Sequence, residues 1–372
     1  MAQHIAFVVN NYLPKVGGVE LHVAGLAKNL ADGGVAVTII SLSNVSTINC
    51  ENNTDVIRLR ATPLIGGVLA IPYPGTKHRI RQILRSRNIT VVSTHTRFFP
   101  MSFIAVRIAR KLRLPVVHTE HGSDHVRGVP VLIRSISKVV DLTLGRYVLR
   151  QSTKVLAISA AAQKFVCDLA RVDSTVFHNA IDTSHFEPRG TIIASRTRII
   201  FLGRLVDGKG WETVLAIGES LIKEFAELEV HFVGDGIRRR NLEEAVLKSP
   251  IKDRTTVHGH IDPGKIRELL AGAVLVNPTT LSEGFQTTLL EAVASRASIV
   301  STPVAAAQYL EDNGADVSIV STMNVDDWIA TTGAVMKSPS PRPSRQLLDS
   351  FDWSTRSREY LRVLDSLDWE NR

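Results

Sequence analysis

The sequence predicts an α/β protein made of two doubly wound parallel sheets. Two observations carry this prediction. Short apolar runs rich in valine and isoleucine alternate with longer helical patterns along the whole chain, as parallel sheets covered by helices require. The chain has 372 residues, more than the roughly 250 to 300 at which a single core stops growing, so two domains are expected.

The predicted strands divide into two sets. They are 5–10, 36–42, 55–59, 90–94, 115–119 and 154–158 in the first half, and 198–202, 229–233, 255–258, 273–277, 297–301 and 316–320 in the second. We expect Rossmann-like domains at 1–185 and 186–350, with the linker near 182–191. Ligands of such folds bind at the carboxyl ends of the strands, where His95, His121, Arg204 and Glu283 fall.

Two glutamates after the predicted strand 273–277 are the most informative feature of the sequence. Glu283 lies just before a helical pattern, and Glu291 lies two turns inside it. Eight residues at about 1.5 Å rise place the carboxylates on the order of 12 Å apart, beyond the about 5 to 9.5 Å of paired glycosidase carboxylates. The glutamates are therefore expected to hold different parts of an elongated ligand. Between them, the amides of Phe285 and Gln286 suit a phosphate at a helix N-terminus.

A glycine-rich loop after the predicted strand 198–202 supplies cationic groups. Arg204 and Lys209 lie in it, and a guanidinium with an ammonium suits two neighbouring phosphates. The segment from Gly203 to Lys209 also fits the phosphate-loop pattern G-x-x-x-x-G-K. Gly210 replaces the Ser or Thr that would hold magnesium there, so a diphosphate clamp is predicted rather than a nucleotide-triphosphate loop.

Several short motifs together cover nearly the whole chain. They are Gly17-Gly18-Val19-Glu20, His95 after Val91-Val92-Ser93-Thr94, the segment Val116 to Gly122, His178-Asn179-Ala180-Ile181-Asp182, Gly203-Arg204 with Lys209-Gly210, Val233-Gly234-Asp235-Gly236, and Glu283-Gly284-Phe285 with Glu291-Ala292. In their joint order and spacing they resemble the retaining glycosyltransferase family 4, which has the GT-B fold of two Rossmann-like domains facing a cleft. The segment 351–372 is similar to the family's final helix, which crosses back to the N-terminal, acceptor-side domain.

The resemblance implies a role for each matching residue. Glu291 would accept the ribose hydroxyls of a nucleoside diphosphate sugar, and Glu283 would bind hydroxyls of the sugar. Arg204 and Lys209 would neutralise the leaving diphosphate. The remaining implied contacts are a hydrogen bond from His121 to the donor sugar near the reacting carbon, Gly17 and Gly18 beside the phosphate and acceptor, Gly284, Phe285 and Gln286 in the donor loop, and His95 as the acceptor-side candidate.

The implied reaction moves a sugar, from a UDP- or GDP-sugar, to an acceptor hydroxyl, with retention through front-face attack. In that mechanism the departing phosphate takes the acceptor proton. Neither a metal nor a cofactor is expected, because arginine, lysine and helix amides can do a cation's work.

Four positions depart from the family pattern. Gln286 and Arg296 stand where glycines are usual, Ala305-Ala306 replace a glycine pair, and Tyr309 replaces a glutamate. These departures concern the shape of the donor loops, so they leave the donor sugar, base and acceptor open.

Charge is divided unevenly along the chain. Residues 1–185 contain 22 Lys and Arg against 10 Asp and Glu, whereas residues 186–372 contain 22 against 26. Arg134, Lys138, Arg146 and Arg150, together with Arg127, interleave with apolar residues between 131 and 144, which indicates a basic amphipathic helix at an anionic membrane face. A solvated helix over a core is the alternative. We expect a lipid or lipid-linked glycan acceptor and no nucleic-acid partner.

Location follows from what the sequence lacks. It shows no signal peptide and no apolar stretch of about 20 residues, and Cys50 and Cys167 have no metal-binding or redox spacing. A cytoplasmic protein, peripheral at the inner membrane face, is expected.

Two other classes of protein share parts of this pattern. A dinucleotide-dependent oxidoreductase would have the same alternation of strands and helices, but no G-x-G-x-x-G joins the first strand to its helix. A non-catalytic sugar-nucleotide-binding or scaffold protein of the same fold stays open.

Overall fold

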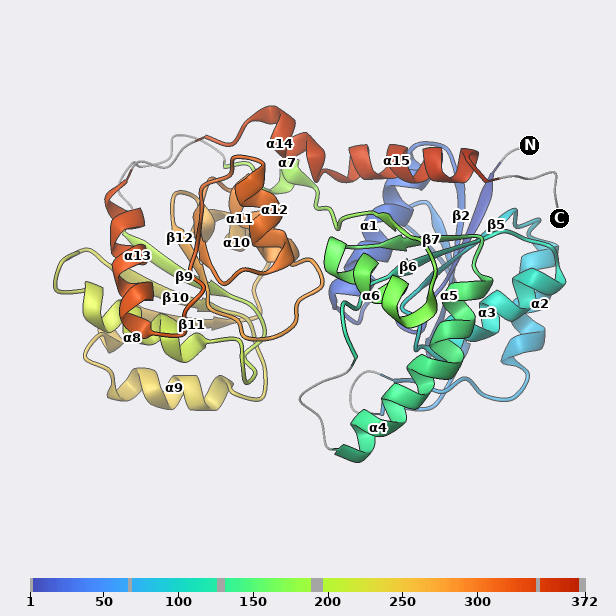
Figure 1. Cartoon of the computed structure of the whole chain (residues 1–372), viewed down its shortest axis with the longest axis horizontal. Helices are drawn as coiled ribbons and strands as arrows, with labels where there is room; N and C mark the ends of the chain where they lie inside the picture. The colour runs from blue at the N-terminus through green and yellow to red at the C-terminus, as the bar shows by residue number, and fades with distance from the viewer. Residues whose placement is uncertain (1–2, 66–68, 126–130, 189–196, 339–341, 368–372) are drawn as a thin grey trace. The chain divides into compact units, whose positions relative to one another are not determined.

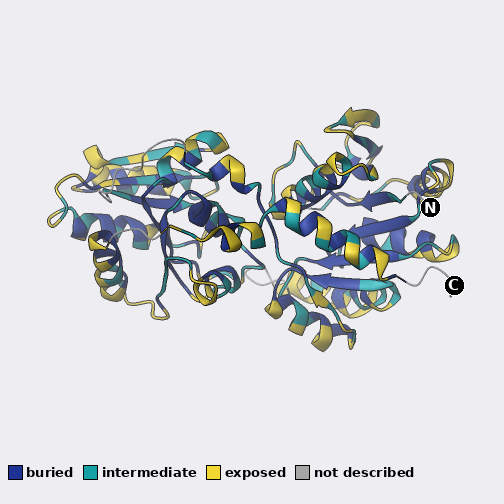
Figure 2. Ribbon diagram, turned by 90° about the horizontal axis from the view of Figure 1, so that it is seen from above, coloured by how far each residue is buried: buried dark blue, intermediate teal, exposed yellow. Residues whose placement is uncertain are grey.

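The computed structural model describes residues 3–65, 69–125, 131–188, 197–338 and 342–367. The chain divides into two compact units, one of Met1–Ala180 with Trp353–Arg372 and the other of Ile181–Asp352. Each unit holds one sheet with helices around it (Figure 1). Figure 2 shows the strands of both sheets mostly in the buried class, with exposed residues concentrated on helices and loops.

The first unit contains an eight-stranded sheet in the order β3-β4-β2-β1-β5-β6-β7-β8. Its strands are β1 (His4–Val8), β2 (Ala36–Ser43), β3 (Thr47–Glu51), β4 (Thr54–Arg60), β5 (Val91–His95), β6 (Val116–Glu120), β7 (Lys154–Ala157) and β8 (Thr175–Val176). Its helices are α1 (Gly18–Asp32), α2 (Thr76–Ser86), α3 (Pro100–Lys111), α4 (Val131–Val140), a π-helical turn (Asp141–Gly145), α5 (Arg146–Gln151), α6 (Ala160–Ala170) and α15 (Trp353–Asp365). All pairings are parallel except that of β3 with β4.

The second unit contains a parallel six-stranded sheet in the order β11-β10-β9-β12-β13-β14. Its strands are β9 (Arg198–Leu202), β10 (Glu229–Val233), β11 (Thr255–Gly259), β12 (Val274–Asn277), β13 (Ser298–Ser301) and β14 (Val317–Ile319). Its helices are α7 (Thr183–Phe186), α8 (Trp211–Leu221), α9 (Arg239–Lys248), a short 3₁₀ helix (Lys252–Arg254), α10 (Pro263–Leu270), α11 (Thr287–Ala294), α12 (Ala305–Asp312), α13 (Val325–Lys337) and α14 (Arg345–Ser350).

The predicted parallel sheets are confirmed, and each predicted strand lies within one or two residues of an observed one. Their apolar runs are buried on both faces, as in β1, where Ile5 to Val8 have no solvent exposure. Two strands at the edges of the first sheet escape sequence analysis. The residues of β3 are mostly exposed and lack an apolar run, while β8 has only two residues.

The last helix belongs to the first unit. Trp353 at its start packs so closely on α1 that a Cβ atom at Gly25 would lie 2.3 Å from the indole. Farther along α15, Tyr360 is fully buried and donates its hydroxyl to Ser93 Oγ of β5 (2.9 Å). The C-terminal segment therefore reaches the centre of the first sheet.

The predicted basic amphipathic helix is interrupted in the structure. None of the residues of α4 is buried, and α4 projects from the first unit (Figure 1). The π-helical turn then separates α4 from α5, where Arg146 and Arg150 donate to the carbonyls of Leu169 and Ala170 (2.7 and 2.9 Å). These two arginines hold the end of α6, which corrects the prediction that they share a free basic face with Arg134 and Lys138. Arg127 lies outside the described residues.

Candidate functional site

The glycine-rich loop of the second unit is folded tightly against the segment after β12. Gly208 and Gly210 have left-handed backbones (φ 80° and 79°), and the Thr280 amide donates to the Gly208 carbonyl (2.8 Å). A Cβ atom at Gly210 would lie 2.5 Å from the carbonyl oxygen of Pro278, so only glycine fits there. This close approach carries Lys209 from the end of β9 to the loop that follows β12.

Lys209 and Glu283 meet as a result. The lysine Nζ lies 2.7 Å from Glu283 Oε1, and the two side chains are 10 and 20% exposed. Arg204, the other predicted clamp residue, is exposed and has no ion pair within the described part of the chain. The structure therefore holds one of the two predicted clamp cations in an ion pair and leaves the other at the surface.

The donor-loop residues lead into α11. Phe285 is 4% exposed and packs edge-on against Tyr309, with ring centroids 5.6 Å apart. Gln286 is the N-cap residue of α11, and its side chain caps no helix amide. Instead, Gln286 Oε1 accepts a hydrogen bond from Asn277 at the end of β12 (3.0 Å). The N-terminal amides of α11 thus have no side-chain cap from this residue, and they suit an anion.

Glu291 lies inside α11 and has no charged partner among the residues that the structure describes. Burial raises the pKa of its carboxyl to about 7, and no ion pair with a described residue offsets that effect. A ligand hydroxyl that donates to this carboxylate would lower its pKa on binding. The two glutamates therefore differ in their surroundings. Glu283 is ion-paired with Lys209, and Glu291 has no ion pair among the described residues.

The remaining positions that depart from the family pattern lie just after α11 and within α12. Arg296 adopts φ 60°, the left-handed conformation that favours glycine after a helix, so this arginine occupies a glycine-like backbone position. Ala305 and Ala306 begin α12, and Ala306 is buried. The Tyr309 hydroxyl lies 3.1 Å from Ser350 Oγ.

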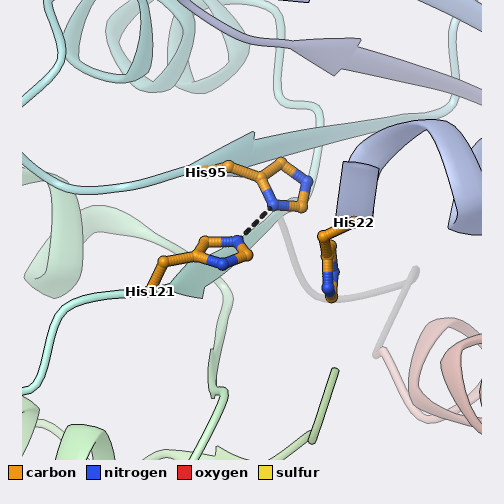
Figure 3. Close-up of side chains that lie close together, drawn as sticks. All are labelled: His22, His95 and His121. Atoms are coloured by element: carbon orange, nitrogen blue, oxygen red, sulfur yellow. Dashed lines mark hydrogen bonds between the residues drawn. The ribbon is translucent and has the colours of Figure 1, made fainter. Parts of the chain in front are cut away.

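Two predicted residues of the first unit, His95 and His121, lie beside a third histidine, His22 (Figure 3). His95 ends β5, His121 follows β6, and His22 comes from α1, and their rings contact one another. His95 Nδ1 lies 3.0 Å from His121 Nε2. Burial holds the pKa of both rings well below 6.5 and lowers that of His22 to about 4, so all three are neutral near pH 7.

His95 differs from its predicted acceptor-side position. It is 1% exposed, and its ring nitrogens contact Ser93 Oγ (3.2 Å) and His121. Both ring nitrogens of His95 are therefore occupied by protein contacts, one of them with His121. His118, on the strand itself, is also fully buried and bonds Thr94 Oγ1 (2.9 Å), in keeping with a structural role.

A buried ion network shapes the turn that carries His121. Glu120 accepts bonds from Arg97 (2.8 Å) and from the Gly122 amide (2.8 Å), and Arg97 also pairs with Asp141 (2.9 Å). Burial alone would raise the pKa of Glu120, but Arg97 and the hydrogen bonds from His118 and Gly122 hold it at about 2. The carboxylate on the strand side of His121 thus stays ionised and the turn stays in place.

Gly17 and Gly18 begin α1 as predicted. Gly17 is the N-cap, and a Cβ atom there would lie 2.4 Å from the Glu20 carboxylate. A Cβ atom at Gly18 would meet nothing within 4 Å. The two glycines therefore differ, since a side chain at Gly17 would displace the Glu20 carboxylate and Gly18 borders open space.

The three histidines are the group of described residues best placed to hold a metal ion, with ligand atoms within 4.8 Å of one another. Nitrogens around a tetrahedral zinc at about 2.0 to 2.1 Å would lie only about 3.4 Å apart, and His95 and His121 already share a hydrogen bond. The absence of a bound metal stays a prediction.

Sequence reasoning missed several residues of this region. His22, Arg97 and Tyr360 lie outside the motifs, whereas Asn179 and Glu120 lie inside two of them without having been singled out. His22 Nδ1 donates to Asn179 Oδ1 (2.9 Å), a contact between residues 157 positions apart. For Asn179 and Glu120, the position inside a family-like segment was the available signal.

Comparison with known proteins matches both units to one kind of enzyme. Residues 16–185 match the model described as Glycosyltransferase Family 4, and residues 196–338 match Glycosyl transferases group 1. The chain is 24% identical to a phosphatidylinositol N-acetylglucosaminyltransferase component of Arabidopsis thaliana, over 87% of this chain and 72% of that protein. It is also 24% identical to an alpha-monoglucosyldiacylglycerol synthase of Streptococcus pneumoniae, over 80 and 70%.

The fold matches solved structures over nearly the whole chain. A crystal structure of Anabaena HepE in complex with UDP and glucose has a TM-score of 0.76 at 15% identity, covering 98% of this chain and all of that one. With two parallel-sheet domains and matches to both family models, the chain belongs to glycosyltransferase family 4 and has the GT-B fold.

Proposed function

We propose that this protein is a retaining glycosyltransferase that moves a hexosyl group from a UDP- or GDP-sugar to a hydroxyl group of a lipid or lipid-linked glycan, as in cell-envelope glycoconjugate synthesis. The observation that carries the proposal is the Lys209–Glu283 pair (2.7 Å) beside the N-terminus of α11, which the Gln286 side chain does not cap. It combines a cation for a leaving diphosphate with a carboxylate for sugar hydroxyls. The relatives named above act on phosphatidylinositol and diacylglycerol lipids, and HepE holds UDP and glucose.

Each second-unit residue has a distinct task in the proposed reaction. Glu291 accepts the ribose hydroxyls, and Glu283, with Oε1 bound to Lys209, offers Oε2 to a sugar hydroxyl. Lys209, Arg204 and the first amides of α11 stabilise the charge that develops on the departing diphosphate. The acceptor oxygen bonds to the anomeric carbon on the face from which the phosphate leaves, and the phosphate takes the acceptor proton.

The test of this function is an assay of three nucleotide sugars. UDP-, GDP- and ADP-sugars are first screened by thermal shift, because a ligand at 100 times its Kd adds about 2.7 kcal/mol of stability. The stabilising donor is then incubated with diacylglycerol or phosphatidylinositol in vesicles, and nucleoside diphosphate release and product anomeric configuration are measured. Acceptor-dependent release with a retained anomer supports the proposal. Binding without turnover would identify the non-catalytic alternative instead.

Access to a lipid acceptor is the second part of the proposal. Leu132, Ile136 and Val139 recur at helical spacing on α4 and are 72, 55 and 61% exposed, while Arg134 and Lys138 are exposed beside them. An exposed apolar face with flanking cations fits the interface of an anionic membrane. No helix in the described ranges is long and apolar enough to cross one. We infer peripheral binding through α4 at the cytoplasmic face.

A further inference from the structure

A chain of buried hydrogen bonds runs from the last helix to His121. Tyr360 of α15 contacts Ser93 Oγ (2.9 Å), Ser93 Oγ contacts His95 Nε2 (3.2 Å), and His95 Nδ1 contacts His121 Nε2 (3.0 Å). Tyr360 and Ser93 are completely buried and His95 is 1% exposed. These three links are therefore shielded from bulk water.

The direction of the protons in this chain follows from its first member. A buried tyrosine hydroxyl needs an acceptor, and Ser93 Oγ is the hydrogen-bond partner of Tyr360 among the described residues. Ser93 has only one proton, so once it accepts from Tyr360 it donates that proton to His95 Nε2. The neutral His95 then carries its proton on Nδ1 and donates it to His121 Nε2.

The last step fixes His121. With Nε2 accepting from His95, a neutral His121 carries its proton on Nδ1, and this nitrogen has no hydrogen-bond partner in the described ranges. His22 does not compete, because its Nδ1 donates to Asn179 and its buried Nε2 has no partner among the described residues. We propose that Tyr360, Ser93 and His95 are positioning residues that hold His121 as the Nδ1–H tautomer, so that it offers a hydrogen-bond donor to an oxygen of the donor sugar.

This inference rests on the proposed function for its ligand, but the tautomer is a property of the free protein. Burial keeps the pKa of His95 and His121 well below 6.5, so the chain stays neutral over the pH range of an ordinary assay. Tyr360 packs against Phe7 and Phe177 through its ring, so removal of the hydroxyl alone preserves that packing. Tyr360→Phe is therefore the informative change, and Ser93→Ala is a second, independent break in the chain.

The test is nitrogen NMR of histidine-labelled, ligand-free protein, with the two rings assigned from the signals lost in His95→Asn and His121→Asn. Wild-type protein is expected to show protonated Nδ1 and unprotonated Nε2 in both rings. In Tyr360→Phe and Ser93→Ala, the His121 signals should move toward those of an Nε2–H ring. A His121 ring that is Nε2–H in wild type, or that is unchanged in both variants, would overturn the proposal.

Turnover gives a second readout. Tyr360→Phe should lower kcat/KM for the nucleotide sugar about five- to tenfold, the effect of about one hydrogen bond. Tyr147→Phe is the matched control. It removes the hydroxyl of a tyrosine whose ring packs against Phe103 and which is not part of the hydrogen-bond chain, so kcat/KM should be unchanged. A wild-type protein without transferase activity would remove the proposed function, whereas the ring signals would still decide the tautomer.

Discussion

Lys209 and Glu283 form an ion pair, with the lysine Nζ 2.7 Å from Glu283 Oε1, although they come from loops after two different strands of the second sheet. The pair is mostly shielded from water, so its attraction is stronger than that of a surface pair. It fixes the ammonium in the ligand-free protein. It also means that the two residues cannot be changed independently.

Loss of the lysine should be the most damaging change in the second unit. Lys209→Ala is expected to lower transfer roughly 10²-fold or more, because a stabiliser of the leaving diphosphate is lost and the Glu283 carboxylate is left without its partner. Glu283→Gln should weaken binding of the intact donor but leave UDP binding equal or tighter, since Lys209 is released. Because the residues touch, the double variant should cost less than the two single changes together. Lys223→Ala, which changes an exposed lysine after α8, is the control. If the free-energy effects of the two single changes simply added in the double variant, Lys209 and Glu283 would not be coupled.

Arg204 allows a separate test of the clamp. It is exposed and has no ion pair among the described residues, so Arg204→Ala should leave the thermal unfolding midpoint unchanged. Transfer should still fall roughly 10²-fold. Near-normal turnover would remove Arg204 from the diphosphate contacts.

Nucleotide binding should depend on pH through Glu291. Burial raises its pKa to about 7 in the free protein, and ribose hydroxyls donate best to the ionised carboxylate. Bound nucleotide therefore favours the deprotonated form, and affinity for UDP should rise as pH increases through 7 and then level off. Calorimetric titration at pH 6, 7 and 8 measures this. Glu291→Gln should bind UDP more weakly, and it serves as the control because UDP itself also titrates in this range. If UDP affinity changed equally with pH in both proteins, Glu291 would not be the group responsible.

Membrane binding should depend on the side chains of α4 and not on the total positive charge of the first unit. Sedimentation with vesicles should increase with anionic lipid content and decrease with salt. Arg134→Ser with Lys138→Ser, or Leu132→Ser with Ile136→Ser, should weaken it. Arg107→Ser with Arg110→Ser removes the same charge from α3 and is the matched control. Equal losses from the α3 and α4 variants would leave α4 as a solvated helix.

The histidine cluster should make the first unit sensitive to mild acid. The folded pKa of His22 is about 4 against an ordinary value of 6.5, so below pH 6.5 the unfolded chain binds the extra proton. The contribution is complete above pH 6.5, and about 2 to 3 kcal/mol of it is lost by pH 4.5. His95 and His121 act in the same direction. Hydrogen exchange of β5 and β6 amides from pH 7.5 to 4.5 should show this fall, with a shallower slope in His22→Phe; equal slopes would contradict it.

The sequence by itself determined the two parallel sheets and most of their strand limits, because an apolar run buried on both faces is a local signal. The uneven division of charge and the glycine-rich loop after β9 could also be identified from the sequence. The sequence located the glycines of this loop, and the structure shows that Gly210 lies against the carbonyl of Pro278. The family followed from motif order, which does not depend on side-chain position.

Only the tertiary structure decided which of those residues meet. Lys209 pairs with Glu283 because a β9 loop packs on a β12 loop, and His95 pairs with His121 because β5 lies beside β6. Tertiary packing also placed Arg146 and Arg150 against the end of α6. It brought Tyr360, near the C-terminal end of the sequence, to Ser93. Such pairings depend on sheet order and helix packing between distant segments, and no local pattern of residues contains that information.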